Sequence, residues 1–147
     1  MTKVMRYAAA IVTAAGCLGA SVLLTGCGTE QEKKVLSPEE TVEAFTRHIV
    51  SGEFDKARSL CDTVMMKDYI DDWMQAWERL EQKDSSVLAI ASSFLAGADI
   101  HIERSEKSDT GRNIYYRIEA EGQSRKRIAK VRKEEGEWRV ETITDVI

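Results

Sequence analysis

The sequence has few residues of the kinds that hold metals, form disulfides or break helices. Its 147 residues include three cysteines, two histidines and one proline. His48 and His101 lie far apart in the chain, and the cysteines do not have the close spacing of a structural metal site. Glycine-rich phosphate-binding motifs are also absent. We therefore expect no metal and no other cofactor.

Acidic residues are missing from the first 29 positions, where Lys3 and Arg6 are the only charges. An apolar stretch from residue 7 to residue 24 follows them, interrupted only by small or hydroxyl residues. A basic start and an apolar segment are typical of a secretory signal peptide. The stretch ends in Leu24-Thr25-Gly26-Cys27, which resembles the lipobox of bacterial lipoproteins. The resemblance implies that residues 1–26 are a signal peptide.

In lipoproteins the signal peptidase cuts before the cysteine, whose thiol carries a diacylglyceryl group. The resemblance therefore implies that Cys27 is the lipid attachment site and that fatty acyl chains hold the protein on the extracytoplasmic face of a membrane. Because Gly28, and not Asp, follows the cysteine, the same resemblance favours the outer membrane in an envelope with two membranes. Two alternatives stay open: lipidation at Cys17, and an uncleaved helix, since the 18 residues from 7 to 24 are just enough to span a bilayer.

Residues 28–36 are polar and aperiodic, so we interpret residues 27–36 as the lipidated cysteine and a linker. With Cys27 lipidated, Cys61 has no partner for a disulfide in the mature chain. It lies in an apolar helical stretch with no neighbouring His or Lys to stabilise a thiolate. We expect Cys61 to be a small buried hydrophobic residue.

The segment from residue 37 to residue 97 has the patterns of helices. Ser37-Pro38-Glu39-Glu40 is a capping box with proline in the first turn. An apolar stripe follows and Gly52 ends the helix. A short second helix and a longer third one follow, and residues 86–95 either extend the third or form a fourth. Their apolar positions recur at helical spacing (Val42, Phe45, Ile49; Phe54, Ala57, Leu60; Met66, Tyr69, Ile70, Trp73, Trp77, Leu80).

After Gly97 the apolar period changes to two. Four alternating stretches follow, around residues 100–103, 114–120, 128–132 and 138–140, with turn-forming residues between them. Short connections make neighbouring strands antiparallel. The sequence therefore predicts an α+β domain over residues 37–147, with N-terminal helices packed on a curved antiparallel sheet of about four strands.

Two short motifs in this domain are similar to those of a known superfamily. Gly-Glu-Phe-Asp-Lys-Ala at 52–57 and Gly-Glu-Trp-Arg-Val at 136–140, in this order of helices and strands, resemble nuclear transport factor 2-like (cystatin-like) domains, above all those of small bacterial lipoproteins. The resemblance implies a sheet wrapped around the long helix and a cone-shaped cavity. The same fold serves isomerases, dehydratases, binding modules and scaffolds, so it does not define a function.

Enzymes of this superfamily use an Asp, His or Tyr that points into the cone. Here His48 lies at the boundary of an apolar helix face, and His101 is out of phase with the apolar strand positions. Asp99 precedes a strand and is expected in a turn, and Tyr115 and Tyr116 must face opposite ways. No acid and base form a pair, so we assign no catalytic residue and do not expect an enzyme.

Trp73, Trp77 and Trp138 invite two interpretations, core packing or the wall of an apolar pocket. Residues 125–133 form a basic cluster, with six Lys and Arg residues among nine positions (Arg125, Lys126, Arg127, Lys130, Arg132, Lys133). Export and the lack of interleaved aromatic residues argue against nucleic acid. We expect a charged hairpin at a sheet edge, or a contact with anionic headgroups or envelope polymers.

These features together predict a membrane-anchored lipoprotein of the cell envelope whose domain is a non-catalytic binding or interaction module. The expected partners are the membrane, through Cys27, and an envelope protein or a small apolar ligand. The alternative is a small acid–base enzyme of the isomerase or dehydratase type. The two hypotheses differ in one observable: whether two titratable side chains converge in a pocket.

Overall fold

The first helix begins where the capping motif predicts. Helix α1 spans Pro38–Val50, and the Oγ atom of Ser37 accepts a hydrogen bond of 3.1 Å from the backbone N–H of Glu40. The Glu40 carboxylate in turn accepts one of 2.9 Å from the backbone N–H of Ser37. Both halves of the capping box are therefore confirmed. Beyond the C-cap, Gly52 has a φ of 73°, a conformation that favours glycine.

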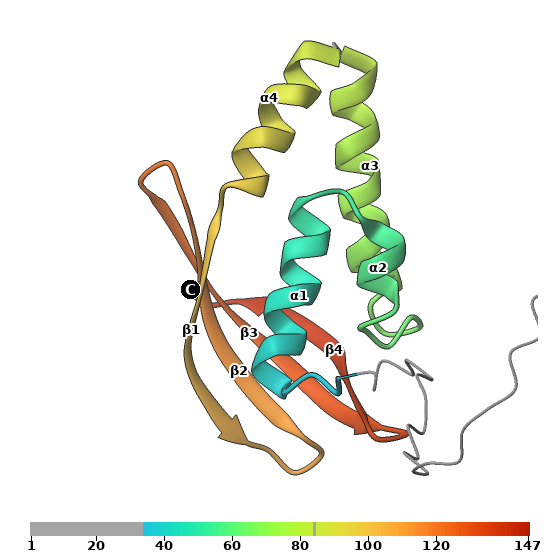
Figure 1. The fold of residues 1–147 in the computed structure, drawn as a ribbon, viewed down its shortest axis with the longest axis vertical. Coiled ribbons are helices and arrows are strands. Elements are labelled where there is room, and N and C mark those ends of the chain that lie inside the picture. The colour runs from blue at the N-terminus through green and yellow to red at the C-terminus, as the bar shows by residue number, and fades with distance from the viewer. Residues whose placement is uncertain (1–33, 84) are drawn as a thin grey trace, which may run out of the picture. The chain divides into compact units, whose positions relative to one another are not determined.

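The computed structural model describes residues 34–83 and 85–147, and residues 34–147 form one compact unit. The predicted signal peptide, Cys17, Cys27 and the linker up to residue 33 lie outside the described residues. Three further helices follow α1: α2 (Phe54–Arg58), α3 (Lys67–Lys83) and α4 (Ser85–Ala96). Residues 86–95 thus belong to a fourth helix and do not extend the third. Helices α3 and α4 lie side by side as a hairpin (Figure 1).

Four strands complete the unit: β1 (Asp99–Lys107), β2 (Arg112–Ala120), β3 (Gln123–Glu134) and β4 (Glu137–Asp145). They form one antiparallel sheet in the order β1-β2-β3-β4, which confirms the predicted α+β class. Asp99 is the first residue of β1, and the expectation of a turn residue was wrong. The two-residue loops Glu121-Gly122 and Glu135-Gly136 have positive φ throughout, as tight hairpin turns require.

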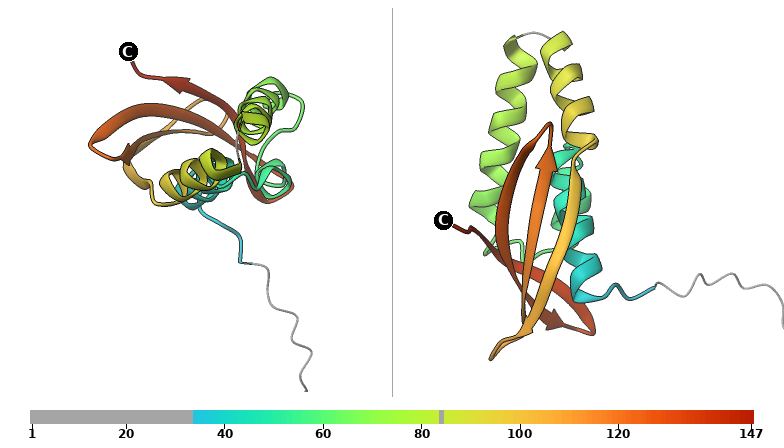
Figure 2. Two further views of the ribbon diagram at one scale, coloured as in Figure 1. Left: turned by 90° about the horizontal axis from the view of Figure 1, so that it is seen from above. Right: turned by 90° about the vertical axis from the view of Figure 1, so that its left-hand side faces the viewer.

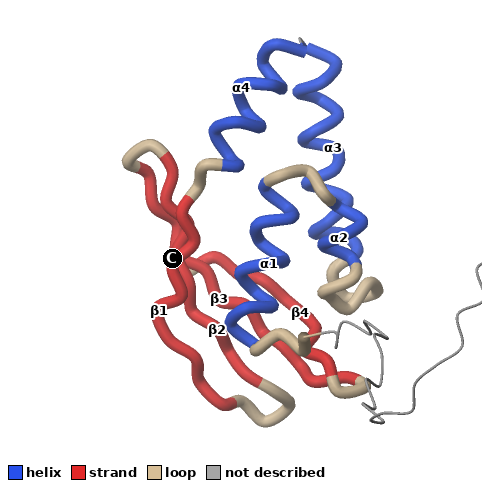
Figure 3. Tube along the Cα trace, viewed as in Figure 1, coloured by secondary structure: helices blue, strands red, loops and turns tan. Residues whose placement is uncertain are grey.

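One face of the sheet packs on helices (Figures 1, 2 and 3). The other face carries charged side chains that form ion pairs with one another. Helix α1 contacts all four strands and buries Val42, Phe45 and Ile49 against them. Of the longer α3, only Ile70 is fully buried. The sheet therefore curves around α1, and the expectation that it wraps the longer helix was wrong. The physical reason is that α1 has the stripe of large, fully buried apolar side chains.

The outer edge of β4 is partly covered by the chain before α3. The backbone N–H of Asp62 donates to the carbonyl of Val140 at 2.8 Å, and the N–H of Val140 donates to the carbonyl of Leu60 at 3.0 Å. These bonds place Cys61 in a short parallel bridge with β4. Pairing of this kind protects an edge strand from other chains.

Candidate functional site

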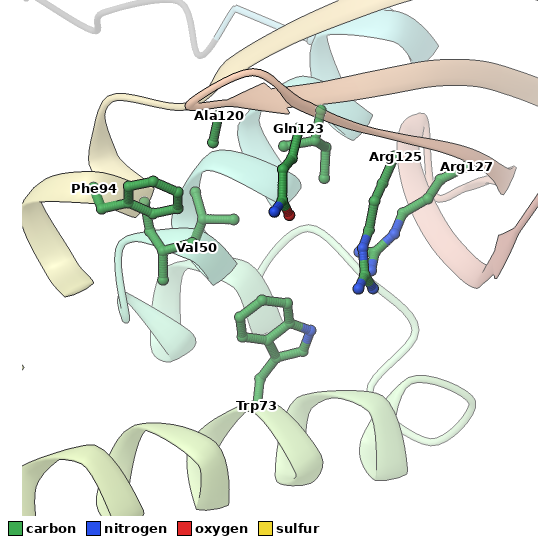
Figure 4. Close-up of a pocket in the computed structure, with 9 residues that line it drawn as sticks. Val50, Trp73, Phe94, Ala120, Gln123, Arg125 and Arg127 are labelled. Carbon is green, nitrogen blue, oxygen red and sulfur yellow. The ribbon is translucent and has the colours of Figure 1, made fainter.

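A pocket of about 200 Å³ opens between the α3–α4 hairpin and the helix-facing side of the sheet. Its walls come from five elements: the end of α1, α3, α4, β2 and β3. Most of the lining is apolar, and the polar groups all come from β3 (Figure 4). The lining residues are Val50, Trp73, Phe94, Leu95, Ile118, Ala120, Gln123, Arg125 and Arg127. A mostly apolar concavity with a few polar groups is the usual form of a small-molecule site.

Strand register places the polar side chains on the pocket side. Arg125 pairs with Ile118 and Arg127 pairs with Tyr116 across the β2–β3 ladder. Partners on neighbouring strands share a face, and successive residues alternate between faces. Gln123, Arg125 and Arg127 therefore point the same way, toward Trp73 on α3 (Figure 4). Lys126, between the two arginines, belongs to the opposite face.

Arg127 is the buried polar group of the pocket, with 9% of its surface exposed. Its Nε atom donates to the Asp145 carboxylate at 2.8 Å, and its Nη1 atom donates to the Tyr69 hydroxyl at 3.0 Å. Burial on its own lowers the pKa of Arg127, but the nearby Tyr69, Tyr116 and Asp145 outweigh that effect and raise it. The guanidinium is therefore charged and fixed in position.

Two phenols lie beside this guanidinium. Burial raises the pKa of Tyr69, against the opposing effect of the Arg127 charge. Burial also raises the pKa of Tyr116, strongly, since its side chain is fully enclosed. The hydroxyls of Tyr116 and Thr46 are both buried in this region without a well-formed hydrogen bond. Both phenols are therefore neutral near pH 7, which suits them to hydrogen bonding and not to proton transfer.

Arg125 differs from Arg127 in its surroundings. Its side chain is exposed, and among the described residues no carboxylate lies within ion-pair distance of it. The polar end of the pocket thus carries two guanidinium groups and, through Asp145, one carboxylate. Two arginines at alternate positions of a strand are roughly 7 Å apart along the backbone. The polar end has an excess of positive charge.

The candidate catalytic residues are not brought together. The His48 Nδ1 atom lies 2.7 Å from the Glu53 carboxylate, and the His101 Nε2 atom lies 3.5 Å from Glu119 on the outer face of the sheet. His101 is exposed, as its place in the alternation predicts.

Asp99 is exposed at the start of β1. Tyr115 stacks under Arg104, with the guanidinium carbon 3.5 Å from the ring centre, and Tyr116 lies in the core. None of these residues lines the pocket described above. The structure therefore supplies no acid–base pair in this pocket.

The three tryptophans are separated. Trp73 lines the pocket, whereas Trp77 packs edge-on against Phe54 with ring centres 6.4 Å apart. Trp138 is half-buried on β4, and the Lys133 ammonium lies 6.0 Å from the centre of its ring. The pocket-wall interpretation fits Trp73, and the packing interpretation fits Trp77.

The basic cluster does not lie at a sheet edge, because β3 lies between β2 and β4. The expectation of a charged edge was therefore wrong. The two faces of the strand also divide the cluster, since Arg125 and Arg127 line the pocket. On the other face, Lys126 lies 3.4 Å from Glu103 and Arg132 lies 3.0 Å from the buried Glu141. Contact with anionic headgroups stays a prediction.

Cys61 is buried, as its apolar surroundings predict. Burial, aided by the charge of Asp62, raises the pKa of its thiol to about 11. Within the described residues no group of three or more His, Cys, Asp or Glu side chains is placed to hold a metal ion. In the same part of the chain no helix is long and apolar enough to cross a membrane.

No protein-family model, curated protein or solved structure matches the chain. The resemblances to lipoproteins and to nuclear transport factor 2-like domains therefore stay predictions from the motifs. The pocket rests on geometry alone. Sequence reasoning missed Gln123, Arg125 and Arg127 as its polar end, although alternation with Lys126 is a signal that two arginines share one face.

Proposed function

We propose that this chain is a lipid-anchored protein of the cell envelope whose domain, of the nuclear transport factor 2-like type, is a non-catalytic module that binds a small, largely apolar ligand. The pocket between α3, α4 and the sheet carries the proposal. The motif Leu24-Thr25-Gly26-Cys27 supports the anchor at Cys27 on the extracytoplasmic face. Where the envelope has two membranes, Gly28 in place of Asp after the cysteine favours the outer membrane.

The pocket supports binding through its lining. Trp73, Phe94 and Leu95 offer large apolar surfaces, and Val50 and Ile118 add further apolar lining. Burying apolar surface is worth about 25 cal/mol per Å². A volume of about 200 Å³ lies below the usual range for drug-sized ligands. The ligand, or the part of it that enters the pocket, is therefore small.

The same residues favour binding over catalysis. The titratable groups that line the pocket are arginines, and the adjacent phenols have raised pKa values. General acid–base catalysis works best with a group whose pKa lies near the working pH. The alternative function, an isomerase or dehydratase, would need such a group in this pocket.

A short brominated alcohol tests the pocket, because bromine quenches the fluorescence of a tryptophan that it contacts. The full-length chain, in a nonionic amphipol, is titrated with 6-bromohexanol. We expect saturable quenching that the substitution Trp73→Phe removes.

Ala120→Phe, which fills the pocket, should weaken this binding at least tenfold. Ala89→Phe places the same ring on an exposed position of α4 outside the pocket and should leave the binding unchanged. Quenching that rises linearly without saturation, or that is the same in the Trp73→Phe protein, would show that the pocket binds no such ligand.

A further inference from the structure

We propose that the ligand carries a single anionic head group, a carboxylate or another oxyanion, which Arg125 and Arg127 hold at the polar end of the pocket while the apolar body lies against Trp73 and Phe94. The inference rests on the proposed function, because it names the chemical class of the ligand of the same pocket. It concerns a site formed by residues of five elements: the end of α1, α3, α4, β2 and β3.

The charge balance at the polar end sets the charge of the head group. Arg125 and Arg127 supply two positive charges, and Asp145 supplies one negative charge through its 2.8 Å contact with Arg127. Asp145 itself is largely exposed and is not among the residues that line the pocket. One negative charge on the ligand makes the polar end of the pocket neutral. A cationic head group would instead be repelled by the two arginines.

The two arginines have different tasks. Arg127 is buried and held by Asp145 and Tyr69, so it presents its remaining surface in one orientation. Arg125 is exposed and free of ion pairs among the described residues, so it can turn to meet the head group. A fixed and a movable guanidinium on one face can both donate to the same oxyanion. Charge-assisted hydrogen bonds of this kind are roughly twice as strong as neutral ones.

Gln123 completes the polar end. Its amide points toward Trp73 from the same strand (Figure 4). An amide N–H is a neutral donor to an oxyanion, and it adds no charge that would change the balance. The apolar end, at Phe94 and Leu95, has no polar side chain from the pocket lining. The ligand therefore has its charge at one end and not in the middle.

The test compares three probes of one length that differ only in the head group: 6-bromohexanoate, 6-bromohexanol and 6-bromohexyl-trimethylammonium. Each is titrated into the full-length protein in nonionic amphipol at pH 7, with quenching of Trp73 as the readout. We expect the acid to bind at least tenfold more tightly than the alcohol, and the cation to bind more weakly than the alcohol. Added salt should reduce, but not abolish, the preference for the acid.

Two variants remove one positive charge each from adjacent positions of β3. Arg125→Gln should reduce the affinity for the acid to that for the alcohol. Lys126→Gln removes the same charge from the opposite face of the strand, outside the pocket, and should keep the preference. Because Arg125 is exposed, its substitution should leave the fold intact, which circular dichroism checks.

Each other outcome overturns a defined part of the proposal. Equal binding of acid and alcohol would refute the anionic head group and leave the apolar pocket standing. If Arg125→Gln and Lys126→Gln weaken the binding of the acid equally, the preference for the acid arises from long-range attraction to the positive charge of the strand. That result would refute the assigned site. Saturable quenching by none of the three probes would refute both the pocket and the inference.

Discussion

The Nη1 atom of Arg127 donates a hydrogen bond of 3.0 Å to the hydroxyl of Tyr69, and this bond joins helix α3 to strand β3. The same guanidinium is held on its other side by Asp145. Helix α3 buries only one residue fully, so its position on the sheet depends on such side-chain contacts. Since Trp73 lies one turn further along α3, the bond also sets the distance between the arginines and the apolar wall of the pocket.

Substituting Tyr69→Phe should therefore lower the free energy of unfolding by about 1.5 kcal/mol, because it removes a hydrogen bond to a charged, buried group. Urea unfolding, followed by circular dichroism, measures the change. Tyr115→Phe is the matched control, since the Tyr115 ring stacks under Arg104 on the outer face. Tyr115→Phe should lower the free energy of unfolding by less than about 0.5 kcal/mol. Equal effects of the two substitutions would show that the contact between α3 and β3 contributes nothing specific.

Gly111 allows the β1–β2 turn to pass close to β3. A Cβ atom at this position would lie 1.9 Å from the carbonyl oxygen of Val131, which is backbone and cannot move without shifting the strand. We expect Gly111→Ala to lower the free energy of unfolding by more than about 2 kcal/mol, as overpacking does. A Cβ atom at Gly97 would lie no closer than 3.5 Å to its neighbours, so Gly97→Ala should change stability little. Thermal unfolding of the two variants compares them directly, and similar melting temperatures would contradict the close approach.

The order of elements could be predicted because each carries a local signal. The capping box fixed the start of α1, and the change from a period near four to a period of two after Gly97 separated helices from strands. Turn residues such as Glu135-Gly136 set the hairpins, and a hairpin fixes an antiparallel neighbour. These signals involve residues within a few positions of one another.

The pocket could not be predicted because it depends on contacts between distant residues. Arg127 and Tyr69 are 58 positions apart, and nothing local to either shows that they meet. The alternation of side chains along β3 indicates that Arg125 and Arg127 share a face of the sheet, but it does not indicate which face the helices cover. The choice of α1 over α3 as the helix inside the sheet likewise depends on how much each buries. Burial is a property of the assembled unit, so sequence patterns of single elements leave it open.

Cys61 should make the stability of the domain depend on pH in the alkaline range. The pKa of its thiol is about 11 in the folded protein, above the ordinary value that it regains on unfolding. The unfolded chain therefore loses this proton first as pH rises. The resulting stabilisation is complete below about pH 8.5 and is lost up to about pH 11, at a slope of about 1 kcal/mol per pH unit.

Urea unfolding of the wild type and of Cys61→Ala between pH 8 and pH 11 isolates this contribution, because other groups titrate equally in both. We expect the variant to be less stable at pH 8 and to lose stability less steeply above pH 9. The native thiol should also resist a thiol reagent at pH 8 and react once the protein is unfolded. Parallel pH curves for the two proteins would show that the Cys61 thiol is not shielded.

The lipid anchor is the part of the proposed function that sequence alone supports, and one pair of substitutions tests it. The motif Leu24-Thr25-Gly26-Cys27 has a large apolar residue three positions before the cysteine, whereas Cys17 follows Ala14-Ala15-Gly16 and lacks one. In cells fed a radiolabelled fatty acid, Cys27→Ala should abolish labelling and leave an unprocessed precursor. Cys17→Ala removes the other N-terminal thiol and should leave both labelling and processing unchanged.

The expected anchoring is strong because several acyl chains contribute. Each buried methylene adds about 0.8 kcal/mol, so two or three chains hold a protein stably where one chain is marginal. The wild type and Cys17→Ala should therefore sediment with the membrane fraction in high salt, which removes proteins bound by charge alone. Label retained in Cys27→Ala but lost in Cys17→Ala would move the anchor to Cys17. A wild-type chain that stays in the membrane fraction at precursor length and without label would instead identify residues 7–24 as an uncleaved helix.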